Sequence, residues 1–444
     1  MRYVSHLSVA ATFLSMAILF GGGGSPAPLA ELIVELTALA TFCVWILLPA
    51  PSRIEVPHDH MLWICVAVAA AVPVLQLLPL PPMLWHILPG REVERATLDL
   101  IGKGDSWRPL SLAPYQTFAS ALSLIPPMVM IYFTSQLTLI QRTKILPWVA
   151  GLAILSALIG VVQVASGDAD WPRFYQHSNR GLATGFQDNR NSTADILVIG
   201  ILALVAYVAI DRRTVKAAWG KAVVAGLIAL MMFTTILTGS RAGTTLLLMC
   251  PLMTIALFRP RLHLSRKMAA GAVGLLLVLS GTFSLLRDNA ALDRTWHRFN
   301  NIADARPMIW ADTSYAIGLY WPIGSGVGTF TTIFPAAERL EAVDASITNR
   351  AHEDYLEFAL EAGIFGSVLL IILAAALVSR GIYVLRFGGE AQVAHAILAI
   401  SVVAALALHS LVDYPIRSMS LAVITAYAIG LLSTPPKKAG SQPG

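Results

Sequence analysis

The segment His352–Gly363 (HEDYLEFALEAG) ends a stretch of about 77 residues, Arg287–Gly363, whose sequence is polar and mixed, whereas long apolar runs lie on both sides of it. Residues 352–363 predict a helix that packs back towards a membrane. Gly363 suits the position just after the last helical turn. We expect this stretch to be the lid of a catalytic site at the membrane surface, with its basic and histidine side chains as the working groups.

The composition is typical of a polytopic membrane protein. Of the 444 residues, 56% are hydrophobic and 13% are charged, against roughly 25% charged residues in soluble domains. The net charge of +5 does not indicate nucleic-acid binding, because the basic residues lie between apolar runs and form no basic-aromatic stripe. Cys43, Cys65 and Cys250 lie inside apolar runs without metal-ligand spacing, so neither a disulfide framework nor a zinc site is expected.

Apolar runs of about 20 residues, enough to cross a hydrocarbon core of about 30 Å, predict an all-α protein with about twelve transmembrane helices. They lie near residues 7–22, 29–48, 61–80, 115–134, 145–165, 192–210, 222–238, 244–258, 268–286, 364–384, 393–412 and 416–432. The two runs flanking Gly239–Gly243 are the shortest and also fit one broken span. The first run fits a retained helix better than a cleaved signal peptide, because the next span begins almost at once.

The positions of lysine and arginine predict the orientation of the spans. With a cytoplasmic N-terminus, six of the seven lysines face the cytoplasm. Residues 1–286 then carry nine spans with outer loops near 81–114 and 166–191; residues 287–363 form a large helical outer loop; residues 364–432 carry three spans; and residues 433–444 form a cytoplasmic tail. The basic residues of the outer loops are almost all arginine. A phosphate ligand favours the planar guanidinium, which is always charged and can form two hydrogen bonds.

Two arginines stand at unfavourable positions before a helix or beside a span. Arg190 lies beside a predicted helix N-terminus, where a cation is disfavoured, so a bound anion would resolve the conflict; capping of the helix by Asn191 or Ser192 needs no ligand. Arg241, within Thr238–Gly243, is costly near a span unless it reaches the interface or has a partner. An interfacial arginine and an anion clamp both fit Arg241.

The third outer loop contains the candidate base. His352 is predicted to lie in the first turn of a helix capped by Asn349, where the positive helix end favours a neutral imidazole that can accept a proton. A structural histidine is the alternative. The Gly324–Phe330 segment predicts a tight turn and no dinucleotide site, because no strand-turn-helix context surrounds it.

Near the end of the chain, His409 and Asp413 are spaced i, i+4 and are expected to bond each other on one helix face. A metal pair is the other possibility for these two residues.

Six short motifs follow one another from Pro109 to Pro415. They are Pro109–Pro114 (PLSLAP); Gly185–Phe186 with Asn189–Asn191; Leu237–Gly243 (LTGSRAG); Arg306 with Trp310 and the Gly324–Phe330 turn; Ala351–Glu357 (AHEDYLE) with Glu361–Gly363; and His409–Pro415 (HSLVDYP). In this order, with a large loop between the third and the fifth, they resemble the O-antigen ligase and O-antigen polymerase superfamily of bacterial envelope proteins.

The resemblance implies a GT-C-like glycosyltransferase in the bacterial inner membrane, with both termini in the cytoplasm and a periplasmic active site. It implies transfer of a glycan from undecaprenyl diphosphate to a hydroxyl of a glycan or of lipid A-core, as in lipopolysaccharide and polysaccharide biosynthesis. The resemblance further implies that no nucleotide sugar, ATP, metal or other cofactor is required. The lipid bilayer and envelope assembly proteins are further expected partners.

By the same resemblance, Arg241 and Arg306 hold the diphosphate, and His352 activates or positions the acceptor hydroxyl. Further candidate substrate contacts are Arg190, Asn189, Arg350, Glu353 and Tyr355. The family often has asparagine close after this histidine, whereas Glu353 and Asp354 add two acids here. This difference leaves open whether a carboxylate shares or orients the base.

Two alternatives stay open. Ligation and polymerisation use the same motifs, so the sequence does not separate them. A secondary transporter also fits twelve spans with Glu31, Glu35 and Arg241 near or within them, but it predicts repeated halves with paired broken helices. The sequence contains no internal repeat, and the long outer loop argues against a transporter.

Overall fold

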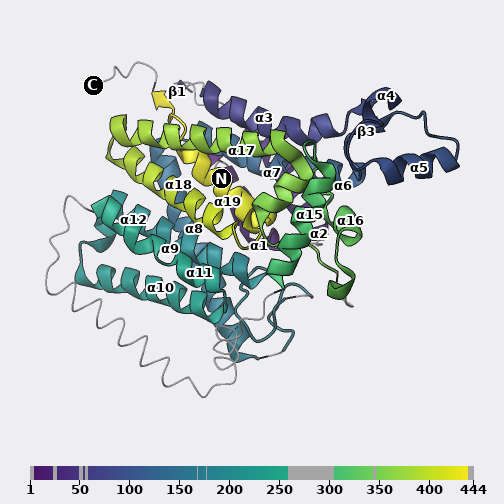
Figure 1. Ribbon diagram of the computed structural model, residues 1–444. Coiled ribbons are helices and arrows are strands. Elements are labelled where there is room, and N and C mark those ends of the chain that lie inside the picture. The colour runs from purple at the N-terminus through teal and green to yellow at the C-terminus, as the bar shows by residue number, and fades with distance from the viewer. Residues whose placement is uncertain are drawn as a thin grey trace.

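The computed structural model describes residues 5–23, 28–49, 54–55, 59–167, 169–176, 178–258, 305–343 and 347–438. This part of the chain is mostly helical (Figure 1). Its only strands are two antiparallel two-residue pairs: β1 (Ile54–Glu55) with β4 (Lys437–Lys438), and β2 (Pro79–Leu80) with β3 (Arg108–Pro109). The all-α fold class is therefore confirmed at the level of secondary structure.

Eight helical segments of the described chain are long and apolar enough to cross a membrane. They are α2 (Pro28–Leu47); α6 (Pro114–Leu122) with α7 (Ile125–Gln136); α8 (Leu139–Ala165); α9 (Arg190–Ile210); α10 (Ala218–Leu237); α11 (Arg241–Leu246) with α12 (Met249–Phe258); α17 (Asp354–Phe387); and α18 (Glu390–His409). Three shorter apolar helices, α1 (His6–Phe20), α3 (His60–Gln76) and α19 (Met419–Leu431), match further predicted runs. The predicted run 268–286 lies outside the described residues, so the twelve-span count stays a prediction.

Helix α9 is the centre of the bundle. Its apolar window is 78% buried, whereas none of the other seven segments exceeds 50%. A helix that is apolar on all sides must be surrounded by other helices or lipid, and α9 packs against α8, α10, α18, α11 and α12. Its first turn is therefore held in a fixed place at one end of the bundle.

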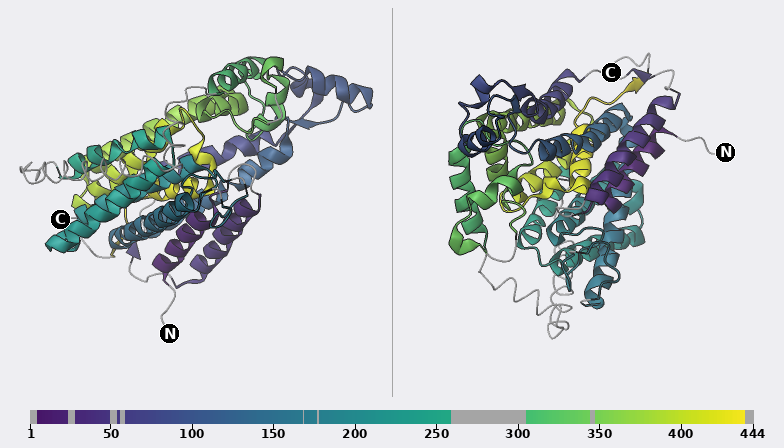
Figure 2. Two further views of the ribbon diagram at one scale, coloured as in Figure 1. Left: turned by 90° about the horizontal axis from the view of Figure 1, so that it is seen from below. Right: turned by 90° about the vertical axis from the view of Figure 1, so that its right-hand side faces the viewer.

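Several polar segments between the spans lie at one end of the molecule. α4 (Pro82–Trp85) and α5 (Glu92–Leu100) project from this end, and α15 (Arg306–Tyr320) and α16 (Phe330–Ile333) lie near them in both Figure 1 and the left view of Figure 2. Three single turns complete the segments around the site: η3 (Phe334–Ala336), η4 (Leu340–Ala342) and η5 (Pro415–Arg417). α15 packs against α17, so this region is attached to the bundle.

Helix α17 is broken at Gly363, where φ is 59° and ψ is −153°. The predicted helical end at this glycine is confirmed, and the apolar run predicted near residues 364–384 follows at once as a second helical half. A Cβ atom at Gly363 would lie 2.2 Å from the carbonyl oxygen of Pro322, so only glycine fits without rearrangement. The backbone N–H of Ser325 donates to the carbonyl of Leu360 at 3.0 Å, which joins the glycine turn to the break.

The Pro109–Pro114 motif supports the same joint. Leu112 N–H donates to the Ser325 carbonyl at 2.9 Å, and the Thr117 hydroxyl donates to the Val327 carbonyl at 2.7 Å. Two of the six motifs therefore have a structural reason: they hold the break between the two halves of α17.

Arg142 is a buried residue that joins helix ends. It is fully buried in the first turn of α8 and donates to the carbonyls of Leu137 at 2.9 Å, Ser135 at 3.1 Å and Ser433 at 2.7 Å. These carbonyls follow or end α7 and α19, where helices leave acceptors unpaired and favour a cation. Arg142 thus ties two helix ends together.

Candidate active site

The first turn of α9 brings several motifs together. α9 begins at Arg190 because the Asn189 side chain caps it, accepting from the N–H of Asn191 at 2.8 Å. The prediction that Asn191 or Ser192 caps this helix is therefore wrong by two or three positions. The shift leaves the Asn191 side chain available for a contact across the site.

Arg190 links α9 to the turn that precedes Arg241. Its Nη1 donates to the carbonyl of Gly239 at 2.9 Å, and Gly239 adopts a φ of 62°. Ser240 then caps α11, of which Arg241 is the exposed first residue. The carbonyl of Gly239 gives Arg190 a hydrogen-bond acceptor at the helix end, and the role of Arg190 as a substrate contact stays a prediction.

His352 lies outside the helix in which it was predicted. α17 begins at Asp354, and its cap is Glu353, whose carboxylate accepts from the N–H of Leu356. His352 has a φ of 53°, the left-handed conformation, which costs a non-glycine residue about 1–2 kcal/mol. Such outliers cluster at functional sites, where the surroundings hold them in place.

His352 contacts the last motif of the chain. Its Nδ1 lies 3.3 Å from Oδ1 of Asp413, and its ring centroid lies 5.0 Å from that of Tyr414. The His352 side chain is 28% exposed, whereas that of Asp413 is 3% exposed. One face of the imidazole is thus fixed by a buried acid while part of the ring stays accessible.

Asp413 in turn leads into the core. Asn191 Nδ2 donates to Oδ2 of Asp413, and Nε2 of His409 lies 3.9 Å from the same oxygen. The nearest partner of His409 is Asp195 of α9, at 2.7 Å from Nδ1 to Oδ1. The expected direct bond between His409 and Asp413 is therefore replaced by a longer approach. Below, "acid–histidine chain" means Asp195, His409, Asp413 and His352.

The electrostatics favour an ionised Asp413. Burial alone would raise the pKa of this carboxyl, but the hydrogen bond from His352 and the neighbouring charge of His409 outweigh burial. Arg306 acts in the same direction, so the pKa of Asp413 lies below its ordinary value. A carboxylate that accepts from Nδ1 leaves Nε2 as the basic nitrogen of the imidazole.

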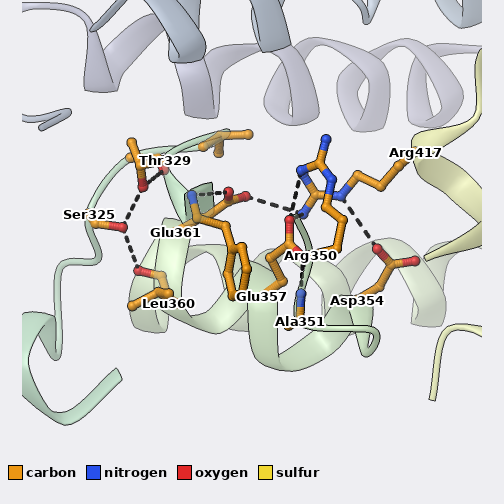
Figure 3. A network of polar contacts seen from close by, with 12 residues as sticks. Ser325, Thr329, Arg350, Ala351, Asp354, Glu357, Leu360, Glu361 and Arg417 are labelled. Carbon is orange, nitrogen blue, oxygen red and sulfur yellow. Dashed lines mark hydrogen bonds and ion pairs between the residues drawn. The ribbon is translucent and has the colours of Figure 1, made fainter. Parts of the chain in front are cut away.

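A second group of charges fixes the first half of α17 (Figure 3). In this ion network, Nη2 of Arg417 lies 3.2 Å from Glu357 and 3.2 Å from Glu361, and Nε lies 3.4 Å from Asp354. Burial would lower the pKa of Arg417, but the three carboxylates outweigh it and raise that pKa. Arg350 joins the network through Nη1, 2.8 Å from Glu357.

The ion network gives Arg350 a structural task, because its charge is matched by a fully buried carboxylate. Tyr355 is likewise engaged, since its hydroxyl donates to the Ala407 carbonyl at 2.8 Å. Asn189 and Glu353 act as helix caps. Their roles as substrate contacts stay predictions.

A cavity of about 230 Å³ opens beside His352, between α15 and the segments that follow it. Its apolar wall includes Met308, Ile309 and Phe334, and its polar wall is formed by Asp312, Glu338, Thr348, Asn349 and His352. Arg306 is the first residue of α15, at one edge of this region, and acts electrostatically on both Asp413 and His409. The polar wall thus offers two carboxylates, an amide, one hydroxyl and an imidazole, of which the Asp312 carboxylate is also paired with Arg339 at 2.6 Å; such groups suit a ligand with hydroxyls.

Sequence reasoning did not assign a role to Asp195 or Arg417. Asp195 carried a signal, because an acid inside an apolar run is a functional candidate by default. Arg417 follows the HSLVDYP motif by two residues and carried none. Both contacts join residues far apart in the chain, so no local pattern could reveal them.

The comparisons with known proteins agree with the motifs. No curated protein matches the chain. The family model described as O-antigen ligase matches residues 226–371, about a third of the chain, which include Arg241, Arg306 and His352. The chain is thus similar to the O-antigen ligase and polymerase superfamily, which confirms the resemblance that its motifs predict.

Proposed function

We propose that this protein is a membrane glycosyltransferase that moves a glycan from undecaprenyl diphosphate to an acceptor sugar hydroxyl at the periplasmic face of the inner membrane. The observation that carries the proposal is the contact of His352 with the buried carboxylate of Asp413, beside a polar cavity and within the stretch that matches O-antigen ligases. The apolar helices and the family likeness support a membrane location and a lipid-linked donor.

His352 acts as general base in this proposal. Its Nε2 takes the proton of the acceptor hydroxyl while the hydroxyl oxygen forms a bond to the anomeric carbon of the donor glycan. The bond from that carbon to the bridging phosphate oxygen breaks, and its electron pair leaves with the diphosphate. Direct displacement inverts the anomeric centre, and a well-placed base contributes about 10²–10⁴-fold to the rate.

Arg241 and Arg306 bind the diphosphate in this proposal. Arg306 begins α15, a helix of 15 residues, so the helix N-terminus adds to its positive charge. Arg241 begins α11 next to the turn held by Arg190. Charge develops on the bridging oxygen as the glycan leaves, and guanidinium groups placed there stabilise it.

The test compares surface glycans of a strain lacking this protein with strains that carry the wild type or His352→Ala. Accumulated long lipid-linked polymer in the deletion and His352→Ala strains supports a ligase, and accumulated single repeat units support a polymerase. An unchanged glycan profile in every strain contradicts the proposal and favours a transporter.

A further inference from the structure

A buried aspartate–histidine pair, Asp195 with His409, lies behind the candidate base, and the proposed reaction does not use it. Asp195 of α9 and His409 of α18 are each 1% exposed, with 2.7 Å between Oδ1 and Nδ1. The second carboxylate oxygen of Asp195 lies 2.9 Å from the same nitrogen. A structural tie between two helices would not require ionisable groups, which are expensive to bury.

The placement of the groups in the acid–histidine chain favours a proton on His409. Its ring stands between two buried carboxylates, at 2.7 Å from Asp195 and 3.9 Å from Asp413. Two negative charges around a neutral ring would leave both unbalanced in a poorly solvated place, whereas an imidazolium offsets one of them. Nε2 of His409 has no hydrogen-bond partner among the described residues, and Asp413 is the acid that it approaches most closely there.

Within the acid–histidine chain, Asp413 contacts both His352 and His409. One of its oxygens, Oδ1, faces Nδ1 of His352, and the other, Oδ2, accepts from Asn191 and approaches His409. Asp413 therefore lies between His352 and the buried pair Asp195–His409, called the inner pair below.

We propose that Asp195 and His409 are positioning residues for the base. The inner pair keeps Asp413 ionised and turned towards Nδ1 of His352, so that His352 presents Nε2 to the acceptor. The inference rests on the proposed function in one respect: the orientation of His352 matters for catalysis only if His352 is the base. The effect of the Asp195–His409 pair on the charge of His352 does not depend on that role.

The test is ¹⁵N NMR of the full-length protein in lipid nanodiscs, with its 10 histidines labelled at both ring nitrogens. His352→Ala and His409→Gln assign the two signals of interest. In the wild type, the neutral imidazole of His352 should carry its single ring proton on Nδ1. The titration of this signal with pH is then compared in Asp195→Asn, His409→Gln and the double variant.

The two single variants should move the titration of His352 in opposite directions, by roughly half to one pH unit, less than a directly contacting charge produces. Asp195→Asn removes a negative charge and turns His409 towards Asp413, so His352 should take up its proton at lower pH. His409→Gln removes a positive charge, so His352 should take it up at higher pH. The double variant removes both charges and should return close to the wild type.

The other titratable and charged groups around His352 are the same in wild type and in every variant, so their effect on the titration of His352 cancels in the comparison. They are Tyr414, Arg306, Asp312, Glu338, Arg350 and Glu353. Shifts in the same direction in both single variants, or none in either, would overturn the inference, because a structural disturbance has no reason to follow the sign of the charge.

Matched control variants are present in the same chain. His395→Gln replaces another buried histidine of α18, bonded to Thr143 at 3.1 Å, and Asp59→Asn replaces an acid paired with Arg380 at 3.1 Å. Neither belongs to the acid–histidine chain, so both should leave the His352 titration unchanged. A shift as large as that of Asp195→Asn in these controls would also overturn the inference.

Glycan transfer by the same preparations separates this inference from the proposed function. Asp195→Asn should lower kcat while the KM values for donor and acceptor change little, because the pair touches neither substrate. If the NMR shifts occur as expected but His352→Ala transfers glycan like the wild type, the proposed function fails and the electrostatic coupling stands. If transfer depends on His352 but the shifts are absent, the coupling fails and the function stands.

Discussion

At the scale of residues, Asp413 is the group on which the site depends. It is buried, yet two histidines and an arginine favour its ionised form, and it directs Nδ1 of His352. A buried carboxylate with several positive neighbours is a common arrangement behind a catalytic histidine, because it stabilises the imidazolium that forms when the base takes a proton. Single substitutions can test the roles of Asp413, His352 and the two candidate arginines one at a time.

Asp413→Asn should lower kcat by about 10–10³-fold, since an amide keeps the shape but loses the charge that supports the base. KM for the donor should change little, because Asp413 lies behind His352. Transfer from synthetic donor by purified protein in proteoliposomes measures both constants. A variant that keeps the wild-type kcat would show that Asp413 does not support the base.

Asp413→Asn should also change how the stability of the folded protein depends on pH. Because the pKa of Asp413 is lowered in the folded protein, its ionisation stabilises the fold above the unfolded pKa of about 3.9. This stability is lost as the pH falls through the lower, folded value. The thermal unfolding temperature should therefore fall less steeply between neutral and strongly acidic pH in Asp413→Asn than in wild type. Parallel curves would contradict the lowered pKa of Asp413.

Arg241→Ala and Arg306→Ala should abolish transfer while membrane insertion stays normal, because both side chains are proposed to bind the diphosphate. Arg241→Lys should also be poorly tolerated, since an ammonium group cannot make the two parallel hydrogen bonds of a guanidinium. Transfer assays with an insertion control measure both effects. Normal transfer in both alanine variants would end the diphosphate proposal.

At the scale of elements, the break in α17 separates the part of the helix that carries the ion network from the part that crosses the membrane. Gly363 makes the break, and the glycine turn and the PLSLAP segment hold it. The ion network then fixes the first half of α17 through Arg417. His352 directly precedes this half, so its position depends on the joint.

Gly363→Ala should destabilise the protein by about 1–3 kcal/mol, because the backbone conformation is unfavourable for alanine and the added Cβ meets the Pro322 carbonyl. Gly318→Ala is the matched control, because Gly318 lies within α15 and a Cβ added there would meet no atom within 4 Å. That control should be neutral or slightly stabilising. Thermal unfolding in nanodiscs compares the two, and equal effects would contradict the role of the joint.

At the scale of the whole molecule, the long apolar helices were predictable because each depends only on the length of its own apolar run. The break at Gly363 and the helix after it were also predictable, the first from the glycine and the second from the apolar run near residues 364–384. The conformation of His352 and the pairing of His409 with Asp195 were not predictable. Both depend on residues brought together by packing around α9, and the Asp195–His409 contact spans 214 positions of the chain.

The same view explains why the motifs are short and scattered. PLSLAP and the glycine turn support α17, LTGSRAG forms the turn before Arg241, and HSLVDYP supplies His409 and Asp413. Each of these motifs contributes residues to a site, or to its support, that is assembled from distant parts of the chain. Residues 226–371, the stretch similar to O-antigen ligases, contain the three residues proposed to act on substrate, while Asp195, His409 and Asp413 lie outside it.

The measurement that tests the central claim most directly is glycan transfer by the purified protein in proteoliposomes, comparing wild type with His352→Ala, together with binding of the undecaprenyl diphosphate-linked donor. If His352 is the base, His352→Ala loses about 10²–10⁴-fold in kcat and keeps its affinity for the donor. Wild-type turnover by His352→Ala, or a loss of donor binding as large as the loss of turnover, would contradict the role of His352 as the base.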